Sequence, residues 1–158
     1  MNKNNDFMME RACNLASQSI LNGGGPFGAI ITDKELNIIS EGYNMVTINN
    51  DPTQHAEIVA IRNACSKLNT FILDEYILYT SCEPCPMCLS AIYWSRIKKV
   101  YYGNTRKDAK NIGFDDEFIY DEIIKNIENR TLSMDMCNSE YAKKSFELWT
   151  EKKDKIEY

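Results

Sequence analysis

Residues 76–102 read YILYTSCEPCPMCLSAIYWSRIKKVYY and predict the fold class of this chain. The apolar run 76–80 predicts a buried strand, residues 86–95 predict a short helix that a proline starts, and residues 99–102 predict a second strand. Strands that alternate with helices along a chain are typical of α/β proteins, in which helices cover a sheet. This stretch therefore predicts an α/β fold.

The residues before this stretch add a helix and a hairpin. Residues 7–22 carry apolar side chains at mostly helical spacing, and Gly23 ends the run. The β-branched runs 29–32 and 37–40 flank a polar turn at residues 33–35, so they predict a β-hairpin.

A second helix is predicted over residues 51–68. Asp51 is expected to be its N-cap, Pro52 occupies the first helical position, and Gln54 follows three residues after the cap. The buried stripe of this helix is expected to consist of Ile58, Ile61, Cys65 and Leu68.

The last third of the chain completes the predicted architecture. Residues 116–127 predict a helix, residues 131–137 a strand, and residues 139–153 a polar helix rich in Glu and Lys. These elements predict a three-layer α/β/α sandwich on a mixed five-stranded sheet. No Pro-, Gly- or Ser-rich linker divides the 158 residues, so a single domain over 1–158 is expected.

The charge balance and the hydropathy exclude several classes of protein. The formal net charge is -5, whereas a domain that neutralises many phosphates is basic, so no stable nucleic-acid partner is expected. No run approaches the ~20 apolar residues of a membrane span. The opening residues MNKNNDFMME lack the apolar core of a secretory signal, so a cytoplasmic protein without a membrane partner is predicted.

Three of the six cysteines lie within residues 80–88, TSCEPCPMC. A disulfide framework is typical of short secreted chains with small cores, whereas a chain of this length can bury a sizeable core. We therefore expect reduced thiols and a metal-binding role for some of these three. Core positions are expected for Cys13, Cys65 and Cys137.

The only histidine, His55, and the pair Cys85 and Cys88 form a candidate zinc site. The two cysteines are three residues apart, which places them on one face of a helical turn. Zinc binds thiolate and imidazole ligands in a tetrahedral arrangement, and three protein ligands leave one position open. Cys85 precedes Pro86 at a helix start, where free N–H groups and the helix dipole lower the pKa of a thiol.

Glu57 stands two residues after His55 and is the candidate proton carrier. A zinc ion with an open position lowers the pKa of the water that it binds to about 7. A carboxylate beside the metal can pass the water's proton to a ring nitrogen or a leaving amine, as hydrolytic deamination requires. The pattern H-x-E followed by P-C-x-x-C is the signature of zinc-dependent nucleobase deaminases, and residues 55–57 and 84–88 contain both halves.

Other interpretations of these motifs stay open at this point. A single histidine near a helix start is commonly structural, and a C-x-x-C pair can be redox-active or simply packed. Cys82 and Cys85 form such a pair too, but Cys82 directly follows a strand, so we expect it to be a packed thiol. Residues 23–28, GGGPFG, match a dinucleotide-binding pattern, yet a helix precedes them and a strand follows, the reverse of what that motif requires.

Four segments carry a family resemblance. They are GPFGA at residues 25–29, NNDPTQHAEIVAIR at 49–62, YTSCEPCPMC at 79–88 and AIYWSRI at 91–97. The chain resembles the cytidine-deaminase-like superfamily and, more closely, the bacterial-type guanine deaminases. The resemblance covers nearly the whole chain, and it implies zinc on His55, Cys85 and Cys88.

The segment that bears on the substrate is GFDDEFIYDEI, residues 113–123, which is similar to guanine deaminases at this place. Guanine presents N1–H and the C2 amino group as adjacent donors, with which a carboxylate of Asp115 or Asp116 can pair. The resemblance points to Asp116 as the catalytic participant. The same acidic residues would also favour a helix N-terminus.

The resemblance implies further contacts with a flat base. Phe27 and Phe114 are candidates for stacking on it. Asn44 would supply an amide, and the backbone N–H of Ala56 would face a substrate heteroatom. The chain ends in Tyr158, and guanine deaminases similarly end in a tyrosine that can close over the pocket, sometimes from a partner subunit.

The same resemblance implies a homodimer. Residues 139–158, the polar helix and tail, are expected to be exchangeable between its subunits. The implied activity is the conversion of guanine, a small-molecule nucleobase, to xanthine and ammonia, with one zinc ion per subunit.

Three alternatives accompany this interpretation. Residues 51–53 and 95–97 also resemble tRNA adenosine deaminases, and the zinc motifs are shared by cytosine deaminases acting on the free base. The segment 113–123 counts against both, and the acidic balance counts further against a tRNA substrate. The third alternative is a non-enzymatic module with a closed structural zinc, in which Cys82 is a fourth ligand and Glu57 has no role.

Overall fold

The computed structural model describes residues 3–137 and 139–158. The chain divides into two compact units, which meet in the sequence at Ile119 and Tyr120. The prediction of a single domain over 1–158 includes residues 1, 2 and 138, which lie outside the described residues, and it stays a prediction. No helix of the described chain is long and apolar enough to cross a membrane.

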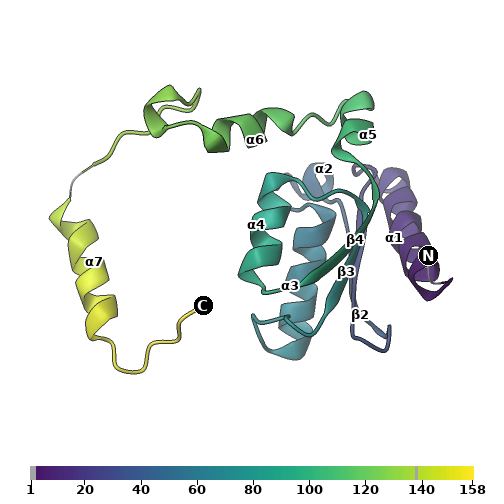
Figure 1. Cartoon of the computed structure of the whole chain (residues 1–158), viewed down its shortest axis with the longest axis horizontal. Coiled ribbons are helices and arrows are strands. Elements are labelled where there is room, and N and C mark those ends of the chain that lie inside the picture. The colour runs from purple at the N-terminus through teal and green to yellow at the C-terminus, as the bar shows by residue number, and fades with distance from the viewer. Residues whose placement is uncertain (1–2, 138) are drawn as a thin grey trace. The chain divides into compact units, whose positions relative to one another are not determined.

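The first unit is built on a four-stranded mixed sheet (Figure 1). Its strands are β1 (Gly28–Thr32), β2 (Ile38–Tyr43), β3 (Ile77–Cys82) and β4 (Lys99–Asn104), in the spatial order β2-β1-β3-β4. β1 pairs antiparallel with both β2 and β3, whereas β3 pairs parallel with β4. The α/β class, the hairpin and the strand–helix–strand unit predicted from the sequence are confirmed.

The predicted fifth strand at residues 131–137 is wrong, because these residues form no strand and all of them are exposed. A strand needs a neighbour that completes its ladder of hydrogen bonds. The backbone N–H of Thr131 is instead bonded to a carboxylate oxygen of Glu122 at 2.7 Å. The sheet of the described chain therefore has four strands.

Helices cover both faces of this sheet (Figure 1). Helix α1 (Lys3–Leu21) packs on one face, where its side chains form a core with Ile30 and Tyr79. Helices α3 (Ala56–Leu68) and α4 (Pro86–Trp94) cover the other face. Their core includes Ala29, Ile31, Ala60, Leu78 and Ile92. Side chains of a strand alternate between its faces, so neighbouring residues of β1 serve both cores and the unit is three-layered.

Gly42 allows α3 to lie very close to the sheet. A Cβ atom at this position of β2 would stand 2.4 Å from the carbonyl oxygen of Ala56 and 2.6 Å from the backbone nitrogen of Ala60. Such distances are shorter than any real Cβ contact, so only glycine fits without moving the helix. The first turn of α3 is thereby held against the sheet.

Helix α3 begins later than the sequence predicted. The expected N-cap, Asp51, lies in a turn in which its carboxylate accepts hydrogen bonds from the backbone and the hydroxyl of Thr53, at 2.8 and 2.7 Å. Because this Asx-type turn uses the carboxylate locally, it closes a loop instead of opening the helix. The loop follows a short helix that the sequence did not predict, α2 (Val46–Asn49), and the N-cap of α3 is His55.

After β4 the first unit continues into α5 (Arg106–Asn111), another helix that the sequence did not predict. Thr105 and Asp108 form a capping box at its start, in which each side chain bonds the other residue's backbone N–H. Helix α6 (Glu117–Ile124) occupies most of the helix predicted at 116–127.

The second unit contains the 3-10 helix η1 (Ile127–Asn129) and α7 (Glu140–Glu151). Ser139 caps α7 by accepting a hydrogen bond from the backbone of Tyr141 at 3.2 Å, so the helix predicted at 139–153 is confirmed. Its large apolar side chains are exposed.

Candidate active site

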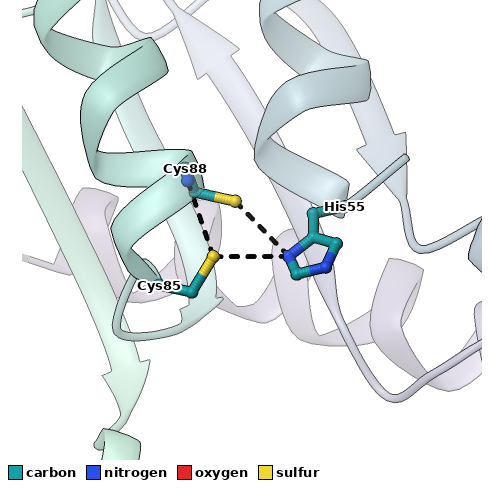
Figure 2. Close-up of side chains that lie close together, drawn as sticks. All are labelled: His55, Cys85 and Cys88. Atoms are coloured by element: carbon teal, nitrogen blue, oxygen red, sulfur yellow. Dashed lines mark hydrogen bonds between the residues drawn. The ribbon is translucent and has the colours of Figure 1, made fainter. Parts of the chain in front are cut away.

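The candidate zinc ligands come from the N-termini of two helices on the same face of the sheet. His55 is the N-cap of α3 and Cys85 is the N-cap of α4, while Cys88 lies one turn into α4. Pro86 follows Cys85 at the first helical position, where its missing N–H costs nothing. Figure 2 shows Nδ1 of His55 directed at both sulfur atoms.

The distances between these three side chains fit a zinc ion. Nδ1 of His55 lies 3.5 Å from Sγ of Cys85 and 3.6 Å from Sγ of Cys88, and the three ligand atoms lie within 4.8 Å of one another. In tetrahedral zinc sites the Zn–S and Zn–N bonds are about 2.3 and 2.0 Å long, so a sulfur and a nitrogen ligand are separated by about 3.5 Å. This donor set leaves one of four tetrahedral positions without a protein ligand.

The position of Cys85 favours its thiolate, which is the form that binds metals. Its sulfur accepts a hydrogen bond from the backbone N–H of Cys88 at 3.5 Å. Hydrogen bonding from Cys88 and His55 lowers the pKa of the Cys85 thiol to about 4, against the opposing effect of burial. The backbone N–H of Cys88 at the helix start contributes to this lowering of the pKa, but the Cys88 side chain is its largest cause.

Glu57 is the buried acidic group of the site. It occupies the second position of α3, and only 5% of its surface is exposed. Its Oε1 accepts a hydrogen bond from the Thr80 hydroxyl at 3.2 Å, and its Oε2 lies 3.3 Å from Sγ of Cys88. Burial raises the pKa of this carboxyl, so it holds a proton more readily than an ordinary glutamate does.

These groups border a cavity of about 460 Å³. Most of the site residues expected from the sequence line it, namely Phe27, Asn44, His55, Glu57, Cys85, Phe114, Asp115 and Asp116. Cys88 and Ala56 are wholly buried and are not among its lining residues. Tyr158 belongs to the second unit and is 71% exposed, and its role stays a prediction.

The glycine-rich segment shapes one wall of the cavity by holding Asn44. Oδ1 of Asn44 accepts hydrogen bonds from the backbone N–H groups of Gly25 and Val46, at 3.2 and 3.3 Å. This orientation leaves the amide nitrogen as the group of Asn44 that can donate to a ligand. A Cβ on Gly24 would stand 2.2 Å from the Asn44 carbonyl oxygen. The close approach of the Asn44 backbone therefore explains why residue 24 is a glycine.

Two aromatic rings meet at the cavity. Phe27 and Phe114 make an edge-to-face contact with ring centroids 4.9 Å apart. Both line the cavity, so at least one face of this pair can pack against a flat ligand.

The two neighbouring aspartates have different environments. Asp115 is exposed, pairs with the Lys110 ammonium at 3.3 Å, and accepts a hydrogen bond from the backbone of Glu117 at 3.1 Å. Asp116 is half-buried, and burial raises the pKa of its carboxyl.

Cys82 lines the same cavity as the candidate zinc ligands His55 and Cys85 but is not part of their cluster. It ends β3, is 5% exposed, and its thiol donates to the carbonyl oxygen of Thr105 at 3.6 Å. Burial raises the pKa of this thiol to about 11, which favours the neutral form rather than a metal ligand. The cluster of possible metal ligands in the described chain contains His55, Cys85 and Cys88 but not Cys82.

Sequence reasoning missed three residues near the site. The sequence pattern places Thr80 only in a strand, although its hydroxyl contacts Glu57. Arg106 and Glu83 both line the cavity, and the guanidinium of Arg106 lies 2.9 Å from the Glu83 carboxylate. The backbone N–H of Arg106 donates to the same carboxylate at 3.0 Å, which lowers the pKa of Glu83. The opposite charges are visible in the sequence, but their proximity depends on the parallel pairing of β3 with β4.

The fold and this site define a zinc deaminase of the cytidine deaminase type. The family model described as the cytidine and deoxycytidylate deaminase zinc-binding region matches residues 2–104, and the chain belongs to this family. A guanine deaminase of Bacillus subtilis is 49% identical over 98% of this chain and 99% of its own. The crystal structure of the Bacillus subtilis guanine deaminase matches with a TM-score of 0.93 over 97% of this chain and 98% of that chain.

Two further relatives share the domain over part of the chain. A solved structure in complex with 2,6-diaminopurine is 33% identical and matches with a TM-score of 0.67, over 69% of this chain and 61% of that chain. A tRNA-specific adenosine deaminase of Haemophilus influenzae is 41% identical over 67% of this chain and 61% of its own.

Proposed function

We propose that this protein is a zinc-dependent guanine deaminase that converts guanine and water to xanthine and ammonia. The observation that carries the proposal is the buried Glu57 carboxyl next to the three-ligand cluster, in a cavity that Asp116 also lines. The likeness to the Bacillus subtilis enzyme supports the choice of base, because it covers 98% of this chain and so includes residues 113–123.

His55, Cys85 and Cys88 would hold one zinc ion per subunit, and zinc bound there supplies a water molecule with a pKa near neutrality. Glu57 would take one proton from a water molecule while the water oxygen adds to C2 of guanine, and it would then give that proton to ring N3. Glu57 or Asp116 carries the second water proton to the amino group. The C2–N bond breaks, a C2 carbonyl forms, and ammonia leaves.

The other residues expected at the site would bind and orient the base. The edge-to-face pair of Phe27 and Phe114 packs against the purine ring. The Asn44 amide nitrogen donates to an acceptor atom of the base, because backbone N–H groups already occupy its oxygen. The backbone N–H of Ala56 would be a second donor, because N–H groups in the first turn of a helix such as α3 lack intrahelical partners; Ala56 itself is wholly buried and lies just outside the residues that line the cavity. Tyr158, from the same chain or from a partner subunit, would close over the pocket.

The test is the initial rate of ammonia release by zinc-loaded protein. Guanine, cytosine, adenine, guanosine and a tRNA anticodon stem are offered in parallel. Rapid release from guanine, against slow release from the others, is the expected result. Turnover of the tRNA stem instead would favour the activity of the Haemophilus influenzae relative, against which the net charge of -5 counts.

Asp116→Asn is expected to lower kcat/KM for guanine by about 10- to 100-fold, because an amide neither accepts as strongly from N1–H nor carries a proton. Asp115→Asn is the matched control and should lower kcat/KM for guanine by about threefold or less. Lys110 and the Glu117 backbone already hold the Asp115 carboxylate. Steady-state kinetics of both variants decide between the two residues, and the opposite ranking would assign the contact to Asp115.

We further propose that the enzyme is a cytoplasmic homodimer whose subunits exchange residues 139–158. The exposed apolar side chains of α7, including Phe146 and Trp149, support a partner for this helix. All six cysteines are unpaired, which agrees with a reducing compartment. Light scattering should give twice the mass of the chain, and a monomeric mass at working concentration would exclude the dimer.

A further inference from the structure

The Glu57 carboxylate has two side-chain neighbours within hydrogen-bonding distance, and they differ in kind. The thiol of Cys88 faces Oε2 at 3.3 Å, and the hydroxyl of Thr80 faces Oε1 at 3.2 Å. A cysteine that ligates a metal does so as a thiolate and has no proton to donate. Of these two contacts, only the hydrogen bond from Thr80 persists once Cys88 is a metal ligand.

Thr80 is placed to hold its hydroxyl in one position. It lies in β3, an inner strand of the sheet, opposite Ala29 of β1 on one side and Tyr102 of β4 on the other. Its side chain is wholly buried and shares a face of β3 with Leu78, which belongs to the core under α3 and α4. A β-branched side chain on a doubly paired strand has few rotamers available.

We propose that Thr80 is a positioning residue for the deamination, and that its hydroxyl fixes the orientation in which Glu57 transfers protons. The inference rests on the proposed function. A carboxylate at the start of a helix has free side-chain torsions unless a partner restricts them, and proton transfer requires a narrow range of distances. The hydrogen bond from Thr80 ties the carboxylate of Glu57 to β3, an inner strand of the sheet.

Thr80→Val removes the hydroxyl and keeps the shape of the side chain. It is expected to lower kcat for guanine by about 10- to 100-fold and to leave KM within about twofold, because base binding is untouched while proton transfer is misaligned. Zinc content and the melting temperature should match those of the wild type. Thr80→Ser keeps the donor and should restore kcat to within about threefold of the wild type.

Thr32→Val is a matched control for the same chemical change. Thr32 lies in the adjacent strand β1, is also wholly buried, and its hydroxyl oxygen has no hydrogen-bond partner among the described residues. This variant should keep wild-type kcat. If Thr80→Val does not fold, Thr80→Ala takes its place in the comparison with Thr80→Ser.

Four results would overturn the inference. They are a wild-type kcat in Thr80→Val, a loss of zinc together with kcat, a Thr80→Ser variant as slow as Thr80→Val, and an equal loss in Thr32→Val. The wild-type chain is assayed first on all the bases. Turnover of a base other than guanine would refute the proposed substrate, and the Thr80 comparison would then be made on that base.

Discussion

Glu57→Gln is expected to lower kcat for guanine by about 1000-fold, within the range that general acid–base catalysis contributes. The glutamine side chain has nearly the same shape but cannot take a proton from water or return one to ring N3. The Glu57 side chain is 5% exposed, so bulk water cannot readily take over its role. The measurement is single-turnover ammonia release, with metal content determined on the same sample.

Two features make this result specific to Glu57. Zinc should stay at the wild-type level, because Glu57 is outside the three-ligand cluster. The exposed Glu10 on α1 provides a control, since Glu10→Gln makes the same substitution at a residue that does not line the cavity and should leave kcat unchanged. More than about a tenth of wild-type activity in Glu57→Gln would refute its role as proton carrier.

Cys85→Ser and Cys82→Ser are expected to have opposite consequences for zinc. A hydroxyl is a poor zinc ligand at neutral pH, so Cys85→Ser should weaken zinc binding by more than about 100-fold and abolish ammonia release. Cys82→Ser should keep zinc binding and ammonia release at the wild-type level, because the Cys82 thiol is hydrogen-bonded to the Thr105 carbonyl and lies outside the ligand cluster. Metal content after competition with a chelator gives the measurement.

The closed structural zinc site predicts the reverse for Cys82. In that interpretation Cys82→Ser would release the metal, and Glu57→Ala would leave function intact. Cys13→Ser serves as a further control, because Cys13 lies on α1 on the other face of the sheet and should affect neither zinc nor activity.

Short-range patterns in the sequence are sufficient to predict most of the strands and helices of the first unit. The alternation of β-branched runs with amphipathic segments predicts β1 to β4 and the main helices between them, because these elements bury apolar side chains at their own periods. The proline at the first position of α4 predicts the helix start at Cys85, which is a local effect of one backbone group.

The errors lie where other contacts compete with local signals. Asp51 and Pro52 have the form of a helix start, but the carboxylate bonds to Thr53 within a turn, and α3 begins at Ala56. Residues 131–137 have strand-like composition but no strand to pair with in the described chain. In both places the sequence has the local propensity for the predicted helix start or strand. The hydrogen-bonding partners that are available decide which structure forms.

The sequence by itself determined which residue types are available for the chemistry. One histidine, a C-x-x-C pair that follows a proline, and a glutamate two residues after the histidine are enough to predict the zinc ligands and the proton carrier. Metal ligands and catalytic acids come from few residue types, so their spacing in the sequence is informative.

Only the tertiary structure decided how these groups are held. Thr80 reaches Glu57 across 23 positions of sequence, and Glu83 reaches Arg106 across the same separation. Gly42 allows α3 to lie close to the sheet, and the start of α3 carries His55 and Glu57. Cys85 follows β3 and begins α4, which covers the same face of the sheet. Such contacts arise from the register of paired strands and from the close packing of a helix on them, and neither leaves a local pattern in the sequence.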